Sequence, residues 1–135
     1  MSKEYIISSP EEMSALGKEL SKNHHIILLE GELGAGKTTF SKGFATGLTI
    51  NPEQVQSPTY TYLNVYDDTL LHIDMYRFSA FGEVIEKGIL DQMGEYDYVL
   101  IERPKWVEQL PFQHYIHLKI EKLSPSERRV LISGY

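Results

Sequence analysis

The sequence predicts an α/β protein, in which the strands of a central sheet alternate with helices. One observation is a strand–turn–helix unit. Residues 26–29 are continuously apolar, as a strand buried on both faces requires, and a glycine-rich turn follows them. Phe40, Phe44 and Leu48 then recur every four residues, which predicts a helix over residues 38–47. The other observation is that the chain returns to strand patterns near its end, so strands and helices are interspersed.

Before the glycine-rich turn, the chain predicts a short strand and a helix with a clear start. Residues 5–7 are rich in β-forming side chains. Ser9 suits the helix N-cap, Pro10 suits the first helical position, and Glu12 completes a capping box. The helix is expected to end near Asn23. Its predicted buried face consists of Met13, Leu16 and Leu20.

An antiparallel hairpin is predicted after the helix of residues 38–47. Residues 54–66 alternate between two side-chain faces, which predicts a strand. Asp67 and Asp68 form a turn, and residues 70–76 return as a second strand. The hairpin is therefore inserted between that helix and the rest of the chain.

The next elements alternate between helix and strand again. Residues 78–90 predict a short helix that ends at Gly88, with Val84 and Ile85 facing inward. Residues 96–102 predict a buried strand, and a short helical turn starts at the proline that follows it. The apolar side chains of that turn are Trp106, Val107 and Leu110.

The chain is predicted to close with an edge hairpin. Its first strand alternates, so that one set of side chains faces the core and the other faces outward. The inward set is Ile116, Leu118 and Ile120. After a Ser-Pro turn, residues 128–132 run back as the second strand.

Two groups of ring side chains resemble binding features but have simpler interpretations. His24 and His25 are adjacent, so in an extended chain they point to opposite sides, and a structural or solvent-exposed role is expected rather than a shared metal. Tyr60, Tyr62 and Tyr66 lie on one face of the predicted strand and could stack on bases. Because no positive charge lies beside them, packing or a protein interface is favoured.

The composition limits the classes of function. The 135 residues suit one domain, residues 1–135, with a single core. The absence of cysteine excludes disulfides, zinc–thiolate sites and thiol catalysis. No apolar run approaches the roughly 20 residues that span a bilayer, and the first residues lack the features of a signal peptide. A net charge of −6 with only four arginines argues against unaided binding to a nucleic acid, so a partner protein is expected to hold any RNA.

Residues 31–38 match the phosphate-binding P-loop pattern, G-x-x-x-x-G-K-[ST]. Backbone N–H groups and the helix dipole attract phosphate at such a turn, and Lys37 adds a full positive charge. Thr38 is placed to offer its hydroxyl to a magnesium ion on the β- and γ-phosphates. A nucleoside triphosphate is the predicted ligand, which favours a cytoplasmic location. The predicted contact residues are Glu32, Leu33, Gly34, Ala35, Gly36, Lys37, Thr38 and Thr39.

A triphosphate site also needs acidic groups, and two apolar strands end in one. Residues 70–74 end at Asp74, and residues 98–102 end at Glu102. We expect Asp74 to be an exposed carboxylate within reach of magnesium, and the longer Glu102 to polarise a water near the γ-phosphate. Spacing leaves these roles open, and either acid could instead be solvated or paired with a nearby lysine. His72, on the same strand face as Asp74, is expected to support that carboxylate or to be structural.

Three motifs together make the chain resemble one family. They are the P-loop extended to residue 39, the sequence S-P-T-Y at residues 57–60, and H-I-D-M-Y-R at residues 72–77, followed by the acidic strand end at Glu102. On these motifs the chain resembles the TsaE family, also called YjeE, which comprises bacterial ATPases of tRNA threonylcarbamoyladenosine (t6A) biosynthesis.

The resemblance implies a P-loop ATPase fold with a mixed parallel and antiparallel sheet flanked by helices, and it implies ATP and Mg²⁺ as ligands. It assigns Thr38 and Asp74 to magnesium and Glu102 to hydrolysis, and we keep Glu102 as a further candidate metal ligand. Lys37 and Glu102 are then the predicted catalytic residues. The implied partners are TsaD and TsaB, with tRNA bound only through their complex and no membrane involved.

One departure from the family pattern concerns the residue after Glu102. The family usually has tryptophan there, in E-W-P, whereas this chain has Arg103 before Pro104 and a tryptophan only at Trp106. Arg103 could contact a phosphate, pair with an acid such as Glu102, or be a tolerated residue on the rim of the site.

The leading hypothesis is a weak ATPase whose turnover, stimulated by its partners, resets the TsaD–TsaB complex without making the modification itself. The alternative is a small-molecule kinase on the same scaffold. Such kinases generally need an arginine-bearing lid, and residues 103–115 leave room for only one short helical turn. A third hypothesis, motivated by the missing E-W pair, is a nucleotide-binding module without useful hydrolysis.

Overall fold

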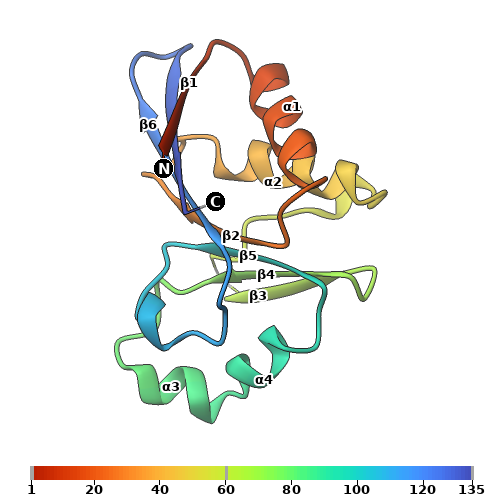
Figure 1. The fold of residues 1–135 in the computed structure, drawn as a ribbon, viewed down its shortest axis with the longest axis vertical. Helices are drawn as coiled ribbons and strands as arrows, with labels where there is room; N and C mark the ends of the chain where they lie inside the picture. Colours follow the sequence, from red (N-terminus) through yellow and green to blue (C-terminus); the bar gives the residue numbers. More distant parts are fainter. Residues whose placement is uncertain (1, 60, 135) are drawn as a thin grey trace.

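The computed structural model describes residues 2–59 and 61–134, and Figure 1 shows their arrangement. The strands are β1 (Ser2–Ile7), β2 (Ile26–Glu30), β3 (Leu63–Tyr66), β4 (Leu70–Asp74), β5 (Tyr98–Glu102), β6 (Ile116–Lys122) and β7 (Arg128–Ser133). The helices are α1 (Pro10–Leu20), α2 (Lys37–Gly47), α3 (Phe81–Glu86) and α4 (Ile89–Met93), with 3₁₀ turns at Pro52–Gln54 and Val107–Gln109. Among these residues, no helix is long and apolar enough to cross a membrane.

Seven strands of the described chain form one mixed sheet in the order β1-β7-β6-β2-β5-β4-β3. Strands β6, β2, β5 and β4 are parallel, and antiparallel pairs extend the sheet on both sides. The predicted mixed sheet and both predicted hairpins are confirmed. Only the position of the closing hairpin differs from the prediction: β1 pairs along the whole of β7 and takes the edge of the sheet itself.

Helices cover both faces of the sheet, with α1 and α2 on one side and α3 and α4 on the other (Figure 1). The side chains of β2 alternate between two hydrophobic clusters, as a strand buried on both faces requires. Ile27 and Leu29 belong to the cluster that contains Phe40 and Phe44 of α2. Leu28 belongs to the opposite cluster, beneath α3 and α4. The apolar run that predicted this strand is thus explained by burial on both sides.

Close packing of α1 against α2 holds the helix that follows the P-loop. A Cβ atom on Gly17 would lie 2.3 Å from the Phe40 carbonyl oxygen, and one on Gly43 would lie 1.9 Å from the Ser14 carbonyl oxygen. Only glycine allows the two backbones to approach this closely. The start of α1 is as predicted at Ser9, whose side chain accepts a hydrogen bond from the Glu12 N–H.

The capping box and the end of α1 differ from the prediction. The Glu12 carboxylate accepts the N–H of Ser8 rather than that of the N-cap residue. The helix ends at Leu20, and residues 21–23 form turns.

The single helix predicted over residues 78–90 is wrong. Gly88 has a φ of +71° and separates α3 from α4, so the helix direction changes there. Val84 is buried as predicted, but Ile85 is 56 % exposed rather than inward-facing. Because α3 has only six residues, with Val84 as its buried residue, Ile85 next to it faces solvent.

The strand predicted over residues 54–66 is much shorter than expected. Pairing with β4 begins only at Leu63, because Tyr62 has a φ of +55° and turns the chain. Residue 60 lies outside the described residues, so the predicted tyrosine face is tested only in part. Tyr62 packs edge-on against Phe78, and Tyr66 is buried at 4 % exposure. These two tyrosines therefore serve packing, as favoured above.

The two adjacent histidines also have structural surroundings. His25 stacks on Tyr98 with ring centroids 4.6 Å apart, and its Nδ1 atom lies 2.9 Å from the Asp97 carbonyl oxygen. Burial together with the neighbouring His25 lowers the pKa of His24. In the described residues, no group of three or more metal-ligating side chains comes together.

Candidate nucleotide-binding site

The P-loop connects the end of β2 to the start of α2, as its sequence predicts. Gly34 and Gly36 have φ values of +82° and +115°, which side-chain-bearing residues rarely adopt. The loop is therefore able to turn its N–H groups toward one point ahead of the helix N-terminus. Glu32 and Leu33 lie at its exposed tip, where Leu33 is 90 % exposed, whereas Ala35 is fully buried beneath it.

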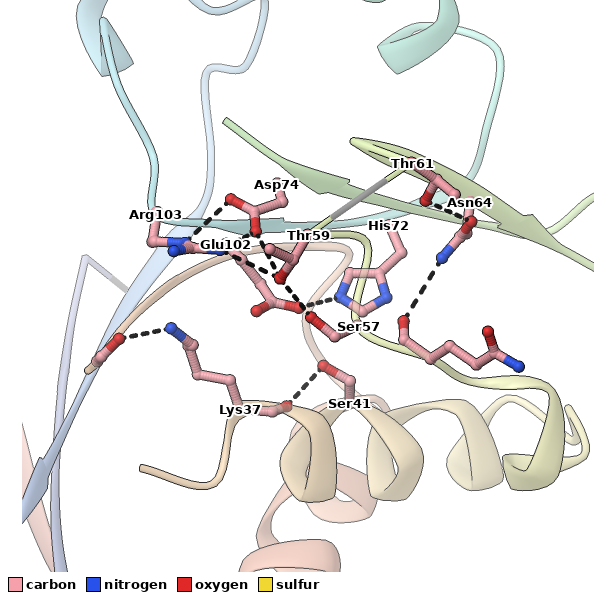
Figure 2. Close-up of polar contacts among 12 residues, drawn as sticks. Lys37, Ser41, Ser57, Thr59, Thr61, Asn64, His72, Asp74, Glu102 and Arg103 are labelled. Carbon is pink, nitrogen blue, oxygen red and sulfur yellow. Dashed lines mark hydrogen bonds and ion pairs between the residues drawn. The ribbon is translucent and has the colours of Figure 1, made fainter. Parts of the chain in front are cut away.

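Lys37 is the first residue of α2 and is only 8 % exposed. Its Nζ atom donates a hydrogen bond to the Gly31 carbonyl oxygen, which folds the side chain back over the loop (Figure 2). Burial lowers the pKa of its ammonium group, and the Glu102 carboxylate opposes this. Of the smaller effects, the Arg103 guanidinium lowers this pKa further and the Asp74 carboxylate raises it. The ammonium is thus a buried charge facing two acids, and an anion bound in the loop would stabilise it.

The two predicted acids end neighbouring parallel strands at the same level. Asp74 is paired with Glu102 in the register of β4 and β5, and Leu29 of β2 lies beside Glu102. Both carboxylates therefore stand at the carboxyl edge of the sheet, next to the P-loop. Asp74 is only 1 % exposed and Glu102 only 2 % exposed. The expectation that Asp74 is an exposed carboxylate is therefore wrong.

Glu102 is held by a buried histidine. The Nε2 atom of His72 lies 2.6 Å from Glu102 Oε2 (Figure 2). On the other side of the ring, Tyr66 Oη lies 3.1 Å from His72 Nδ1. The Gln56 N–H in turn donates to the Tyr66 oxygen. The Tyr66 hydroxyl donates to the Gln56 carbonyl oxygen over 3.1 Å, so the His72 ring is held between the Tyr66 oxygen and the Glu102 carboxylate. Of the two roles expected for His72, support of Asp74 is wrong, because its ring contacts Glu102 instead.

Asp74 is instead paired with Arg103. The Arg103 Nε atom donates to Asp74 Oδ1 over 3.1 Å, and Nη2 donates to Oδ2 (Figure 2). Oδ1 also accepts the Tyr76 N–H at 3.0 Å, and Oδ2 accepts the Thr59 hydroxyl at 3.3 Å. Of the three predicted roles for Arg103, pairing with an acid is the one observed, and the acid is Asp74 rather than Glu102.

A cavity of about 250 Å³ lies between the P-loop and the acids. Predicted residues line most of it: Leu33, Gly34, Gly36, Lys37, Thr38, Thr39 and Glu102. Ser57, Thr59 and Arg103 complete the wall. Asp74 is close by but lies behind Arg103 and Thr59, with which it is hydrogen-bonded. The structure therefore brings the predicted residues together, with Glu102 facing the cavity and Asp74 shielded from it.

A second cavity, of about 350 Å³, adjoins the first across the P-loop. Gly34, Gly36 and Thr39 line both cavities. Besides Ala35 of the P-loop, the other walls come from the end of β1, the start of α1, and the turn between β6 and β7 with the start of β7: Ile7, Ser8, Ser9, Pro10, Met13, Pro125, Ser126 and Arg128. Sequence analysis did not identify this cavity, because its walls are assembled from the two ends of the chain.

Arg128 joins the last hairpin to the P-loop. Its Nε atom donates to the Ala35 carbonyl oxygen over 2.9 Å, and Nη2 donates to that of Gly34 over 3.3 Å. Its Nη1 atom donates to Ser124 over 2.8 Å within its own turn. Arg128 is therefore a site residue that sequence reasoning missed. The only signal was an arginine at a strand start, which does not reveal its partner.

The side-chain oxygen atoms around the first cavity are suitable ligands for a magnesium ion. Mg²⁺ prefers oxygen ligands and usually takes one or two carboxylates together with phosphate oxygens and water. The Thr38 hydroxyl and the Glu102 carboxylate both line the cavity. Asp74 would join them only if its bonds to Arg103 opened.

A glycine-rich loop between a buried parallel strand and a helix, with acids at the ends of the adjacent strands, defines the class of P-loop α/β proteins. The family model described as "Threonylcarbamoyl adenosine biosynthesis protein TsaE" matches residues 7–130. The chain belongs to this TsaE family.

Individual relatives and a solved structure agree with this assignment. A TsaE protein from Aquifex aeolicus is 40 % identical, and the alignment covers 96 % of this chain and 95 % of the relative. A TsaE protein from Bacillus subtilis is 35 % identical over 93 % of this chain and 82 % of the relative. The crystal structure of YdiB from B. subtilis superposes with a TM-score of 0.73 at 27 % identity, covering 99 % of this chain and 86 % of that one.

Proposed function

We propose that this protein is an ATP-binding P-loop ATPase required for the t6A modification of tRNA. It hydrolyses ATP weakly and acts in the cytoplasm with a TsaD–TsaB complex, which it resets between turnovers. The observation that carries the proposal is the convergence of Lys37, Thr38 and Glu102 on one cavity at the P-loop. The names of the relatives support the pathway, since both describe tRNA threonylcarbamoyladenosine biosynthesis proteins.

Binding of the triphosphate follows from the loop. Backbone N–H groups of residues 32–38 surround the β- and γ-phosphates, and Lys37 exchanges its bond to the Gly31 carbonyl oxygen for a phosphate oxygen. The adjoining 350 Å³ cavity, next to Arg128, has room for the nucleoside. Thr38, with Glu102 or Asp74, would hold Mg²⁺, which neutralises charge on the phosphate oxygens.

Hydrolysis requires a base beside the γ-phosphate. Glu102 faces the cavity, and its Oε2 atom is occupied by His72, so its Oε1 atom is the oxygen left to accept a proton from water. The water oxygen attacks the γ-phosphorus, the bond to the β-phosphate oxygen breaks, and ADP and phosphate leave. His72 holds the carboxylate in position and keeps it from rotating away.

The net charge of −6 argues against independent binding of tRNA by this chain, so the partner proteins are expected to hold the tRNA.

The proposed function is tested by reconstitution of the modification reaction. The protein is mixed with TsaD, TsaB, tRNA and threonylcarbamoyl-adenylate, and modified tRNA is counted per complex. We expect several turnovers with ATP, and one or fewer when the protein is omitted. Equal yields with and without it would refute the proposed role.

The same samples distinguish the other hypotheses. A kinase would transfer phosphate from ATP to a metabolite in proportion to ATP consumed, and residues 103–115, with only one 3₁₀ turn, offer no lid for this. A pure nucleotide sensor would bind ATP yet show no hydrolysis in a single-turnover assay, with or without partners. Free phosphate released from ATP is the outcome expected here.

A further inference from the structure

We propose that Arg103 and the divalent cation compete for Asp74, so that Arg103 sets how strongly nucleotide binding depends on metal. This inference rests on the proposed function, because it concerns the same site. It differs from the family resemblance, which supplies no role for an arginine at this position. The proposal gives Arg103, the residue that departs from the family pattern, a role in metal binding.

The first step is that Asp74 has no free oxygen in this structure. Each carboxylate oxygen accepts one hydrogen bond from Arg103 and one more, from the Tyr76 N–H or the Thr59 hydroxyl. The carboxylate is also 1 % exposed, so water does not solvate it. A buried carboxylate stays ionised only while it is paired with a cation or fully hydrogen-bonded. A metal ligated by Asp74 must therefore take the place of Arg103.

The second step is that Arg103 is able to leave while Asp74 is not. Asp74 lies on β4 inside the sheet, whereas the Arg103 side chain is 29 % exposed and lines the phosphate cavity. The guanidinium carbon lies 4.3 Å from the centre of the Tyr76 ring, which provides a flat surface along which the guanidinium could slide. Arg103 also has a φ of +49°, at the point where the chain turns out of β5.

The third step concerns charge in the cavity. When Arg103 neutralises Asp74, the triphosphate meets one fewer negative charge, so ATP is able to bind without metal. When a metal replaces Arg103, the guanidinium is released beside Lys37, where a phosphate oxygen is the available acceptor. Both states keep Asp74 paired. Arg103 thus favours metal-free binding and opposes capture of the metal by Asp74.

The test uses two readouts on the full chain. The first is electron paramagnetic resonance with Mn²⁺ alone, and the second is calorimetric ATP affinity in Mg²⁺ and in EDTA. In R103Q we expect Mn²⁺ to bind about tenfold more tightly than in the wild type, within the range typical of coupled sites. We also expect the ratio of ATP affinity in Mg²⁺ to that in EDTA to rise about tenfold. Adding D74N to R103Q should abolish both gains.

The matched control is R128Q. Arg128 also lies beside the P-loop, but its guanidinium bonds are to backbone carbonyl oxygens such as those of Ala35 and Ser124. R128Q should therefore change ATP affinity by the same factor in Mg²⁺ and in EDTA. Equal Mn²⁺ affinities and equal ATP ratios in R103Q and wild type would overturn the competition.

Two further outcomes keep the test decisive. If R103Q does not fold, R103K keeps one positive charge but loses the two-bond geometry, and an intermediate gain in Mn²⁺ affinity is expected. Unchanged Mn²⁺ binding in R103K would then count against the proposal. If the wild type fails to bind ATP, the proposed function fails, but the Mn²⁺ measurement still tests the competition because it uses no nucleotide.

Discussion

The two acids at the carboxyl edge of the sheet have the same register and the same burial, yet they are held in different ways. Glu102 is paired with His72, and both side chains are almost completely buried, at 3 % and 0 % exposure. Asp74 is paired with Arg103, whose side chain is 29 % exposed. A completely buried partner fixes a carboxylate, whereas a partly exposed charged partner is able to exchange for another cation. The comparison predicts a fixed acid for proton transfer and an exchangeable acid for metal.

The largest effect should come from removing the fixed acid as a base. Glu102→Gln keeps the size of the side chain but accepts no proton, so we expect kcat for ATP hydrolysis to fall about 10²- to 10⁴-fold. ATP affinity measured by calorimetry should stay within about threefold, because the loop makes the main phosphate contacts. Normal turnover in Glu102→Gln would remove Glu102 from the catalytic role.

Lys37→Ala should affect both acids together, since both carboxylates favour the charged form of the Lys37 ammonium. Its loss removes the full positive charge of the P-loop and leaves the triphosphate opposite two carboxylates. We expect ATP affinity to fall about 100-fold, in keeping with a charge-assisted hydrogen bond. Lys42→Ala is the control, because Lys42 lies on the exposed face of the same helix. Comparable losses in the two variants would indicate a general effect of charge rather than a site contact.

Asp74→Ala tests the exchangeable acid. We expect ATP affinity in Mg²⁺ to fall about tenfold more than affinity in EDTA, within the usual range for coupled ligands. Thermal unfolding should be measured on the same sample, because Arg103 loses its partner in this variant. Equal losses with and without metal would argue against contact between Asp74 and the metal.

The smallest of these effects should come from the partner of Glu102. His72→Leu removes the donor to Glu102, and we expect kcat to fall about tenfold with KM unchanged, less than for loss of the base itself. The free energy of unfolding should drop by about 1–3 kcal/mol, because a buried acceptor is left without its donor. His72→Gln, which is able to donate from a similar position, should restore part of kcat. A change in KM alone would show that His72 has only a structural role.

The parts of the fold that depend on neighbouring residues could be predicted from the sequence. The P-loop is local, and the two acids end apolar runs, so their positions followed from short stretches of chain. The side chains that pair with the two acids could not be predicted from short stretches of chain. His72 reaches Glu102 across 30 residues, and Arg103 reaches Asp74 across 29. These partners depend on the register of β4 beside β5, which no local pattern specifies.

Errors in the predicted elements have equally physical causes. Gly88 ends α3 as expected, but a second helix, α4, starts directly after it, and the sequence pattern did not separate the two. Tyr62 adopts a positive φ that alternation of side chains does not reveal, so β3 starts late. Arg128 was missed because it reaches Ala35 across 93 residues, through the hairpin that closes the chain.

The central claim, that one acid is fixed and the other exchangeable, is tested most directly by a crystal structure with Mg²⁺ and a non-hydrolysable ATP analogue. We expect that His72 is still hydrogen-bonded to Glu102, that the metal is ligated by Thr38 and Asp74, and that Arg103 has moved from Asp74 toward a phosphate. A structure in which Arg103 remains on Asp74 while Glu102 has left His72 to ligate the metal would contradict it.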